Sequence, residues 1–320
     1  MNRALTLKTG SRLHFGPLSY RPQEGRHFGG CGVMISEPGV EFFVREAATD
    51  RIEGEGGERV ERFLHRLRDY FAGRFTIPPV EIQIRQMLPS HVGLGSGTQT
   101  GLAVAQALAI ISRQSNVKVE ELARAVGRGA RSAIGINGFM RGGLFVEGGK
   151  RTEHELGTPV TRLELPSDWC FLIVRPQRIA GLHGEAEKKA FDQLGPMPEE
   201  TTARLCKCLV MDLLPAIVSH DYAAAGNSLY EYGATAGQFF APVQGGIFAS
   251  SQMQQVAELL QSEAVPGVGQ SSWGPTLFAL MQHRDQAEFW KQRLAELDVG
   301  QGTTIEIGEP LNHGALIEVE

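Results

Sequence analysis

Cysteine is scarce in this sequence, and its positions exclude two kinds of site. Only 4 of the 320 residues are cysteine, too few for a disulfide framework in a chain of this length. Cys206 and Cys208 are the only close pair, and they fall within an expected helix with no second pair to complete a tetrahedral metal site. We therefore expect free thiols, including Cys31 and Cys170, and no zinc or redox centre.

Long apolar runs and basic clusters are also absent. The longest apolar stretch, 102–111, is too short to span a bilayer and contains Gln106, and residues 1–10 lack the apolar centre of a signal peptide. The formal net charge is -5, and no run rich in Lys and Arg provides the electrostatic footprint of a nucleic-acid-binding protein. We expect a cytoplasmic protein with small-molecule partners, no nucleic acid and no membrane. The oligomeric state stays open, with a homodimer as one alternative.

The length and the hydrophobic periodicity predict two domains that mix helices and strands. With 320 residues, 42% hydrophobic and 21% charged, the chain is globular and exceeds the usual size of one core. We expect an N-terminal domain over 1–165 and a C-terminal domain over 166–320, in an α/β or α+β fold. Strands are expected at 4–8, 40–44, 80–85 and 170–174, helices at 60–71, 118–127, 184–194, 201–218, 222–236, 251–263 and 276–281, and turns at 129–149.

A glycine-rich loop at 89–99 is the most informative segment. It joins the expected strand at 80–85 to a helix that starts at its end, and every second position from 93 to 97 is glycine (Gly93, Gly95 and Gly97). The N-terminus of a helix binds anions through unpaired N–H groups and the backbone dipole, and glycine lets a phosphate approach closely. We expect an anion site here; the alternative is a turn capped by Ser96 or Thr98. A second glycine-rich loop, at 267–275, is expected to precede another helix.

The first loop differs from two common phosphate-binding motifs and matches a third. No Lys follows the last glycine, as a P-loop requires, and Thr98 stands where the dinucleotide motif needs its last glycine. The remaining pattern, P-x-x-x-G-L-G-S-G-T, resembles the central motif of the GHMP superfamily of small-molecule kinases, whose usual form is P-x-x-x-G-L-G-S-S-A. The resemblance implies a two-domain GHMP kinase-like fold with the ligand in a cleft between the domains.

Five short blocks narrow the resemblance, and they occur in order between residues 11 and 275. They are Ser11-Arg12-Leu13-His14-Phe15-Gly16, His91-Val92-Gly93-Leu94-Gly95-Ser96-Gly97-Thr98-Gln99, Arg131-Ser132-Ala133-Ile134-Gly135-Ile136, Gly181-Leu182-His183-Gly184-Glu185 and Gly269-Gln270-Ser271-Ser272-Trp273-Gly274-Pro275. Together they are similar to the β-ribofuranosylaminobenzene 5′-phosphate synthase family. This implies transfer of a ribosyl 5-phosphate group from phosphoribosyl diphosphate to para-aminobenzoate, with loss of diphosphate and CO2, as an early step of methanopterin synthesis. The para substituent of the aromatic acceptor stays open.

Kinase chemistry has less support in the segment that follows the central helix. Kinases of this fold commonly use an Asp there to activate the substrate hydroxyl, whereas 127–143 contains no Asp or Glu and has Asn137 as the nearest substitute. The same segment contains Arg128, Arg131 and Arg141, whose guanidinium groups suit a polyanionic sugar. An ATP-dependent kinase of a small molecule is the alternative function, and a non-catalytic metabolite sensor is a third.

The resemblance and the residue chemistry together suggest a set of site residues. For catalysis we expect Glu185 and Arg131, with Mg2+ held by Glu185 and Glu187 and no organic cofactor. The alternative for Glu185 is a helix-start residue favoured by the dipole. The expected substrate contacts are Arg12, His14, His91, Gly93, Leu94, Gly95, Ser96, Gly97, Thr98, Gln99, Arg128, His183, Gln270, Ser271, Ser272 and Trp273.

Parts of this set have more specific expected roles. Arg12 and His14 are assigned to a phosphate or to the ring carboxylate, although His14 alone could equally make a structural hydrogen bond. Residues 270–272 are expected to complete the anion site from the second domain. Flat apolar surface for the aromatic ring is offered by Phe15, Phe28 and Trp273.

Substitution of Glu185 by Gln keeps the shape of the side chain and removes its charge. Because both proposed roles of Glu185 act on the diphosphate end or on charge that develops as diphosphate leaves, we expect turnover to fall on the order of 10²-fold or more. Binding of aminobenzoate should change far less. Release of CO2 from carboxyl-labelled para-aminobenzoate measures the effect, and a near-wild-type rate would reduce Glu185 to a helix-start residue.

Overall fold

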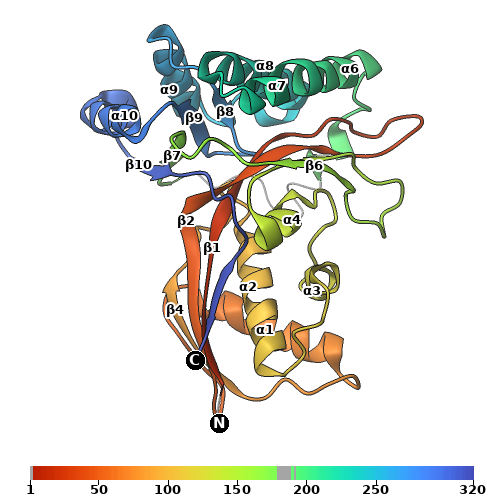
Figure 1. Ribbon diagram of the computed structural model, residues 1–320. Coiled ribbons are helices and arrows are strands. Elements are labelled where there is room, and N and C mark those ends of the chain that lie inside the picture. The colour runs from red at the N-terminus through yellow and green to blue at the C-terminus, as the bar shows by residue number, and fades with distance from the viewer. Residues whose placement is uncertain (1–2, 179–188, 191) are drawn as a thin grey trace.

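The computed structural model describes residues 3–178, 189, 190 and 192–320, which form two β-sheets with helices packed on them (Figure 1). The first sheet has the order β11-β1-β2-β4-β3, with β5 paired to β2 and β6 paired to β5. Its strands are β1 (Ala4–Gly16), β2 (Gly30–Glu46), β3 (Arg51–Glu53), β4 (Val80–Gln86), β5 (Leu144–Glu147), β6 (Pro159–Leu163) and β11 (Leu316–Val319). Its helices are α1 (Gly57–Phe71), α2 (Ser96–Ile111), α3 (Val119–Ala125) and α4 (Ile134–Arg141).

The second sheet is antiparallel and has the order β10-β7-β9-β8. Its strands are β7 (Cys170–Pro176), β8 (Val268–Gln270), β9 (Leu277–Met281) and β10 (Thr303–Gly308). The helices around it are α6 (Glu199–Lys207), α7 (Leu214–Val218), α8 (Tyr222–Gln244), α9 (Ser251–Ser262) and α10 (Arg284–Glu296), with a π-helical turn at Cys208–Leu213 and a 3-10 turn at Asp298–Gly300. This mixed α+β architecture confirms the expected fold class.

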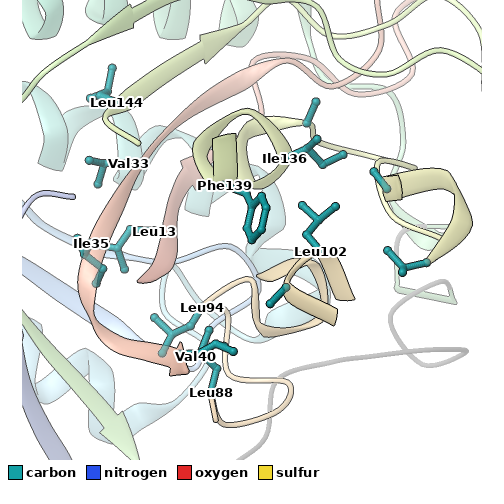
Figure 2. Close-up of a cluster of buried hydrophobic side chains, with 14 of the residues drawn as sticks. Leu13, Val33, Ile35, Val40, Leu88, Leu94, Leu102, Ile136, Phe139 and Leu144 are labelled. Atoms are coloured by element: carbon teal, nitrogen blue, oxygen red, sulfur yellow. The ribbon is translucent and has the colours of Figure 1, made fainter. Parts of the chain in front are cut away.

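Helix α2 is the central element of the first half. It contacts β1, β2, α1, α3 and α4, and its Ala-rich sequence is buried along nearly all of its length, which lets the neighbouring elements pack closely. Figure 2 shows the apolar cluster beneath the N-terminal end of α2, where Leu94 of the glycine-rich loop is drawn among buried side chains of β1, β2 and α4. The loop is therefore supported from below by the core.

Two expectations about local structure were wrong, and glycine was the cause of both. Residues 129–149 are not all turns, because they contain helix α4 and strand β5, whose apolar residues are buried. Residues 276–281 are not a helix, because Leu277–Met281 forms the fully buried strand β9 between β7 and β8. A glycine-rich loop before an apolar run predicts a change of direction, but it does not decide between helix and strand.

The expected helix at 201–218 is divided into three parts. Helix α6 gives way to the π-helical turn, and Pro215 lies in the first turn of α7. The residues before Pro215 keep right-handed helical dihedrals, so the proline lies in a continuous helical run, where its missing N–H coincides with the return from π- to α-helical structure. Of the expected helix at 184–194, residues 184–188 and 191 lie outside the described residues, and residues 189, 190, 192 and 193 are helical.

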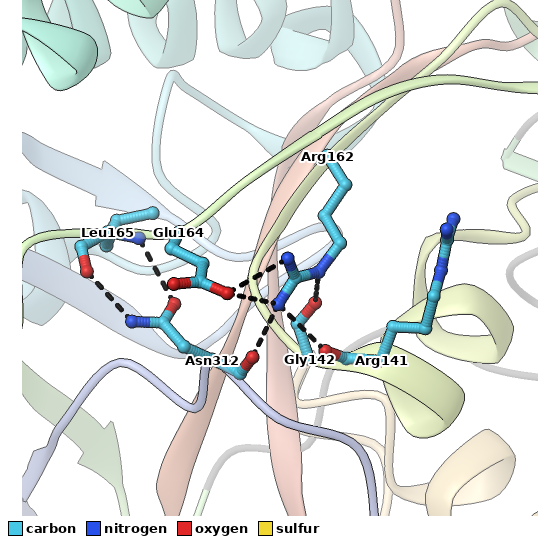
Figure 3. Close-up of polar contacts among 6 residues, drawn as sticks. All are labelled: Arg141, Gly142, Arg162, Glu164, Leu165 and Asn312. Carbon is cyan, nitrogen blue, oxygen red and sulfur yellow. Dashed lines mark hydrogen bonds and ion pairs between the residues drawn. The ribbon is translucent and has the colours of Figure 1, made fainter.

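The end of the sequence returns to the first sheet. Strand β11 pairs with β1 in antiparallel register, Leu5 opposite Val319. Arg162 helps to fix this return (Figure 3), since its Nε donates to the Gly142 carbonyl at 2.9 Å and its Nη2 to the Arg141 carbonyl at 3.0 Å, and Nη2 also reaches the Asn312 carbonyl. The carbonyls at the end of α4 are satisfied in this way. The division at residue 165 stays a prediction.

Tyr232 of α8 connects the two halves through a buried hydrogen bond. Its hydroxyl donates to the Gly16 carbonyl at 2.9 Å, and the side chain is fully buried. Tyr232→Phe leaves that carbonyl without its donor, so we expect the free energy of unfolding to fall by about 1–3 kcal/mol. Urea unfolding measures the loss, and Tyr70→Phe, at a side chain that is 42% exposed, is the control. Equal effects of the two substitutions would contradict the role given to Tyr232.

Candidate active site

A cavity of about 710 Å³ lies where the two halves of the described structure meet. Its walls come from the end of β1, the polar face of α1, the glycine-rich loop at the start of α2, the segment 126–132, helix α8 and the second glycine-rich loop. These elements are far apart in sequence, so the cavity depends on tertiary packing. It lies where the sequence predicts the ligand cleft.

The first loop presents an uncapped helix N-terminus to the cavity. Gly95 is the N-cap of α2 with φ 71° and ψ 18°, a left-handed conformation, and no side chain caps the helix. The N–H groups of Thr98 and Gln99 donate to the Gly95 carbonyl. The alternative of a turn capped by Ser96 or Thr98 is therefore not the one observed, and the first N–H groups of α2 are placed to receive an anion.

The second loop packs directly on the first and holds it in shape. Ser271 Oγ donates to the Gly93 carbonyl at 2.8 Å and accepts the backbone N–H of His14 at 3.0 Å. The hydroxyl of Thr276 donates to the Val92 carbonyl, and the N–H of Ser272 donates to the His14 carbonyl at 2.9 Å. A Cβ on Gly93 would lie only 2.3 Å from the Ser271 carbonyl oxygen, so this contact requires glycine.

The structure brings most of the expected site residues together and separates a few. Residues in the cavity wall are Arg12, His14, His91, Gly93, Gly95, Ser96, Gly97, Thr98, Arg128, Arg131, Gln270, Ser272 and Trp273. Leu94, Gln99 and Ser271 are buried outside the wall. His183, Glu185 and Glu187 lie outside the described residues, so their expected roles stay predictions.

The three buried residues support the wall from behind. Leu94 belongs to the core in Figure 2. The amide of Gln99 donates to the Gly135 carbonyl at 2.8 Å and accepts the Thr9 hydroxyl at 3.1 Å, which ties α2 to α4 and β1. Ser271 is engaged with backbone groups on both sides. A sequence motif identifies a functional segment. It does not tell which of its residues face the ligand and which fix the segment to the rest of the protein.

Three arginines of α1 line the cavity, and none of them was among the site residues predicted from the sequence. Arg59, Arg62 and Arg66 recur at helical spacing opposite the buried face of α1. Arg59 donates to Ser90 Oγ at 3.0 Å and to Ser96 Oγ at 3.3 Å. Burial, together with the nearby charges of Arg128 and Arg62, lowers the pKa of Arg59 to about 10. The signal was present in the sequence as a cationic stripe on the polar face of an amphipathic helix.

The cavity has a strong excess of positive charge. Six arginines line it: Arg12, Arg59, Arg62, Arg66, Arg128 and Arg131. No Asp or Glu occurs among the wall residues that the structure describes. Several guanidinium groups gathered in one cavity suit a ligand with more than one phosphate group.

His14 is a neutral polar group in this cationic wall. Burial, and secondarily the charge of Arg12, holds the pKa of His14 well below its usual range. Its Nδ1 has no hydrogen-bond partner among the described residues. At neutral pH the imidazole is therefore neutral and adds no charge to the cavity.

A buried carboxylate lies next to the segment 127–143, and it belongs to Glu147 of strand β5. Its Oε2 accepts the N–H of Ala133 at 2.7 Å, next to the wall residue Ser132, and the side chain is 1% exposed. Burial raises the pKa of Glu147. It lies behind the wall, so it holds the arginine-bearing segment in place and does not face the ligand. It comes from β5, and a reading of the segment alone could not find it.

Apolar and aromatic side chains also line the cavity. Phe240 of α8 and Trp273 of the second loop have ring centroids 4.9 Å apart, and both line the cavity. Phe15, Phe28 and Phe248 add to the same wall. The cavity thus offers a cationic region at the start of α2 and an aromatic region, which suits a ligand pair with one polyanionic and one aromatic member.

The described residues do not form a metal site. No group of three or more His, Cys, Asp or Glu side chains is placed to hold a metal ion in the ranges that the structure covers. The expected Mg2+ ligands, Glu185 and Glu187, lie outside those ranges. Across the described helices, none is both long and apolar enough to cross a membrane.

Comparison with known proteins gives the family. A protein of Archaeoglobus fulgidus named beta-ribofuranosylphenol 5'-phosphate synthase is 31% identical over 292 residues, which are 86% of this chain and 87% of that one. The chain belongs to this synthase family. A relative of the same name from Methanothermobacter thermautotrophicus is 28% identical over 303 residues, 88% of this chain and 89% of that one. These relatives are named as synthases, so this member of the family is an enzyme.

The superfamily and the fold agree with that assignment. The description "GHMP kinases N terminal domain" matches residues 58–143. A homoserine kinase from Cytophaga hutchinsonii has the same fold, with a TM-score of 0.66 and 15% identity, over 98% of this chain and 97% of that one. A Lactococcus lactis galactokinase has a TM-score of 0.69 and 16% identity, over 98% and 95%. The expected GHMP kinase-like fold is confirmed.

The glycine at the N-cap of α2 gives a test of the anion site. In Gly95→Ala the new Cβ would take a left-handed backbone and lie 3.3 Å from Arg12 Cβ. The strain should cost about 1–2 kcal/mol of stability, and stabilisation by inorganic pyrophosphate should be largely lost. The matched control is Gly73→Ala, which has a similar φ of 80° and open space around the added Cβ. Thermal unfolding with and without pyrophosphate should show similar strain in both variants and loss of ligand stabilisation in Gly95→Ala alone; an unchanged pyrophosphate shift would remove Gly95 from the site.

Proposed function

We propose that the protein transfers the ribosyl 5-phosphate group of phosphoribosyl diphosphate to a para-substituted benzoate, with release of diphosphate and CO2, in the cytoplasm and as an early step of methanopterin biosynthesis. The observation that carries the proposal is a cavity that combines six arginines and the open start of α2 with aromatic rings. Membership of a family named for a ribofuranosyl 5'-phosphate product supports it.

The aromatic acceptor has two candidates that differ only at the para position. The residues suggest para-aminobenzoate through the family resemblance, whereas the relatives' name contains phenol, which corresponds to para-hydroxybenzoate. Both substituents donate electrons to the ring carbon that bears the carboxylate. The same attack is therefore available to either acceptor. The assay of CO2 release with each labelled acceptor decides between them.

The reaction balances without an oxidant or a strong base. The ring carbon that bears the carboxylate forms a bond to the anomeric carbon, while the bond from that carbon to diphosphate breaks and diphosphate takes the electron pair. The bond to the carboxylate then breaks, CO2 leaves, and its electron pair restores the aromatic ring. The product is a C-riboside that keeps its 5′-phosphate.

The residues of the cavity act on charge and position in this scheme. The guanidinium groups and the first N–H groups of α2 bind the phosphates and stabilise negative charge on the departing diphosphate. Phe240 and Trp273 hold the acceptor ring against the reacting carbon. Arg131 and Glu185 keep their proposed catalytic roles. Because the described wall provides no acidic ligand, we derive no step through Mg2+.

An ATP-dependent kinase is the second candidate, because an open helix N-terminus would accept the phosphates of ATP equally well. The hydroxyl-activating carboxylate expected in a kinase is missing from the described wall. Asn137, its nearest substitute, donates to the Ala133 carbonyl at 3.1 Å within α4 and does not line the cavity. The synthase reaction therefore fits the wall better.

Release of labelled CO2 tests the proposal directly. With phosphoribosyl diphosphate and Mg2+ present, we expect the wild type to release CO2 from carboxyl-labelled para-aminobenzoate or para-hydroxybenzoate and to form one diphosphate per CO2. Omission of phosphoribosyl diphosphate is the control and should abolish release. No release from either acceptor, together with stabilisation by ATP alone, would replace the synthase with the kinase.

A further inference from the structure

Arg59 contacts the first glycine-rich loop at two points. It lies near the start of α1, and its guanidinium contacts Ser90, before Gly93, and Ser96, between Gly95 and Gly97, at 3.0 Å and 3.3 Å. Both serines line the cavity. The guanidinium therefore lies beside the uncapped N-terminus of α2, where an incoming anion would meet it.

Two other cations occupy the same corner. Arg62 lies one turn further along α1, and Arg128 lies against the first turn of α2, where a Cβ on Gly97 would be 2.6 Å from its Cζ. The nearest acidic partner of Arg62 is Glu58 at 4.0 Å, a side chain that is 94% exposed. No carboxylate among the described wall residues enters this corner. Burial, and secondarily the like charges of Arg128 and Arg62, lowers the pKa of Arg59.

The donors in this corner outnumber what a single phosphate group can accept. They comprise two α1 guanidinium groups, that of Arg128, the Ser96 hydroxyl and the first N–H groups of α2. Arg59 and Arg62 belong to none of the sequence blocks that carried the family resemblance. Guanidinium groups pair with phosphate oxygens in a bidentate way, and a diphosphate offers oxygens on two phosphorus atoms.

We propose that Arg59, Arg62 and Arg128 form, with the first turn of α2, the subsite for the diphosphate of the donor. On binding, Arg59 exchanges its serine contacts for phosphate oxygens. The leaving group then lies at the α1 side of the cavity, and the anomeric carbon faces the aromatic wall. The identity of the donor rests on the proposed function, whereas recognition of a diphosphate does not require turnover.

A purely structural role for Arg59 is the competing explanation. In that case the residue holds the loop and touches no ligand. Ser90→Ala separates the two explanations, because it removes one of the ties and leaves the guanidinium in place. The control variant is Arg51→Gln, which removes one positive charge as Arg59→Gln does. Arg51 lies outside the cavity wall, and its side chain is 66% exposed.

Calorimetric titration with inorganic pyrophosphate in EDTA tests the subsite, since the measured affinity then comes from the protein's own groups. We expect Arg59→Gln to weaken pyrophosphate binding by about ten- to hundredfold, and Arg59→Lys by less. Ser90→Ala and Arg51→Gln should stay within about threefold of the wild type. Inorganic phosphate should bind more weakly than pyrophosphate, because it contacts fewer of the donors. For the same reason, Arg59→Gln should reduce the affinity for phosphate by a smaller factor.

Two outcomes would overturn the subsite. Equal pyrophosphate affinity in Arg59→Gln and Arg51→Gln would show that Arg59 does not touch the anion. Equal losses in Ser90→Ala and Arg59→Gln would show that Arg59 acts only by holding the loop. Failure of CO2 release from the wild type, with pyrophosphate binding lost only in the arginine variants, would remove the proposed function and leave the diphosphate subsite in place.

Discussion

The contact between the two glycine-rich loops determines the geometry of the site. Ser271 joins the Gly93 carbonyl to the backbone of β1, and Thr276 joins the same pair of loops at Val92. Gly95 can adopt its left-handed conformation because the preceding residues are fixed by this contact from the second half of the chain. The N-terminus of α2 is thus kept open by tertiary structure, and the cavity wall, the arginine cluster and the aromatic side are all placed relative to it.

The charge distribution and the geometry of the glycine-rich loop both suit the binding of an anion. Like charges that lie close together in a protein repel one another, and the described wall of this cavity holds six arginines. Glu147 offsets part of that charge from behind, through the segment that carries Arg131. The remaining positive charge would favour a bound polyanion, which is the ligand class that we propose for this cavity.

Much of the fold and part of the site could be predicted from the sequence. Alternation at 80–84 and helical spacing after 99 located β4 and α2, and the glycine pattern located the loop between them. Strand β9 and helix α4 could not be assigned, because short apolar runs near glycine suit either structure. Leu94 and Ser271 belong to motif segments but face the core or the backbone, and only tertiary contacts show this. The arginines of α1 were visible as a polar face, but nothing in the sequence placed that face beside the loop.

The pairing of β11 with β1 links the earliest and latest described segments of the chain. During synthesis, β1 leaves the ribosome long before its partner on that side exists. Until residues 316–319 emerge, one edge of the first sheet has unpaired backbone groups that could join another chain. Closure of that edge, and with it protection from self-association, therefore waits for residues 316–319, and the Arg162 side chain contacts the returning segment at the Asn312 carbonyl.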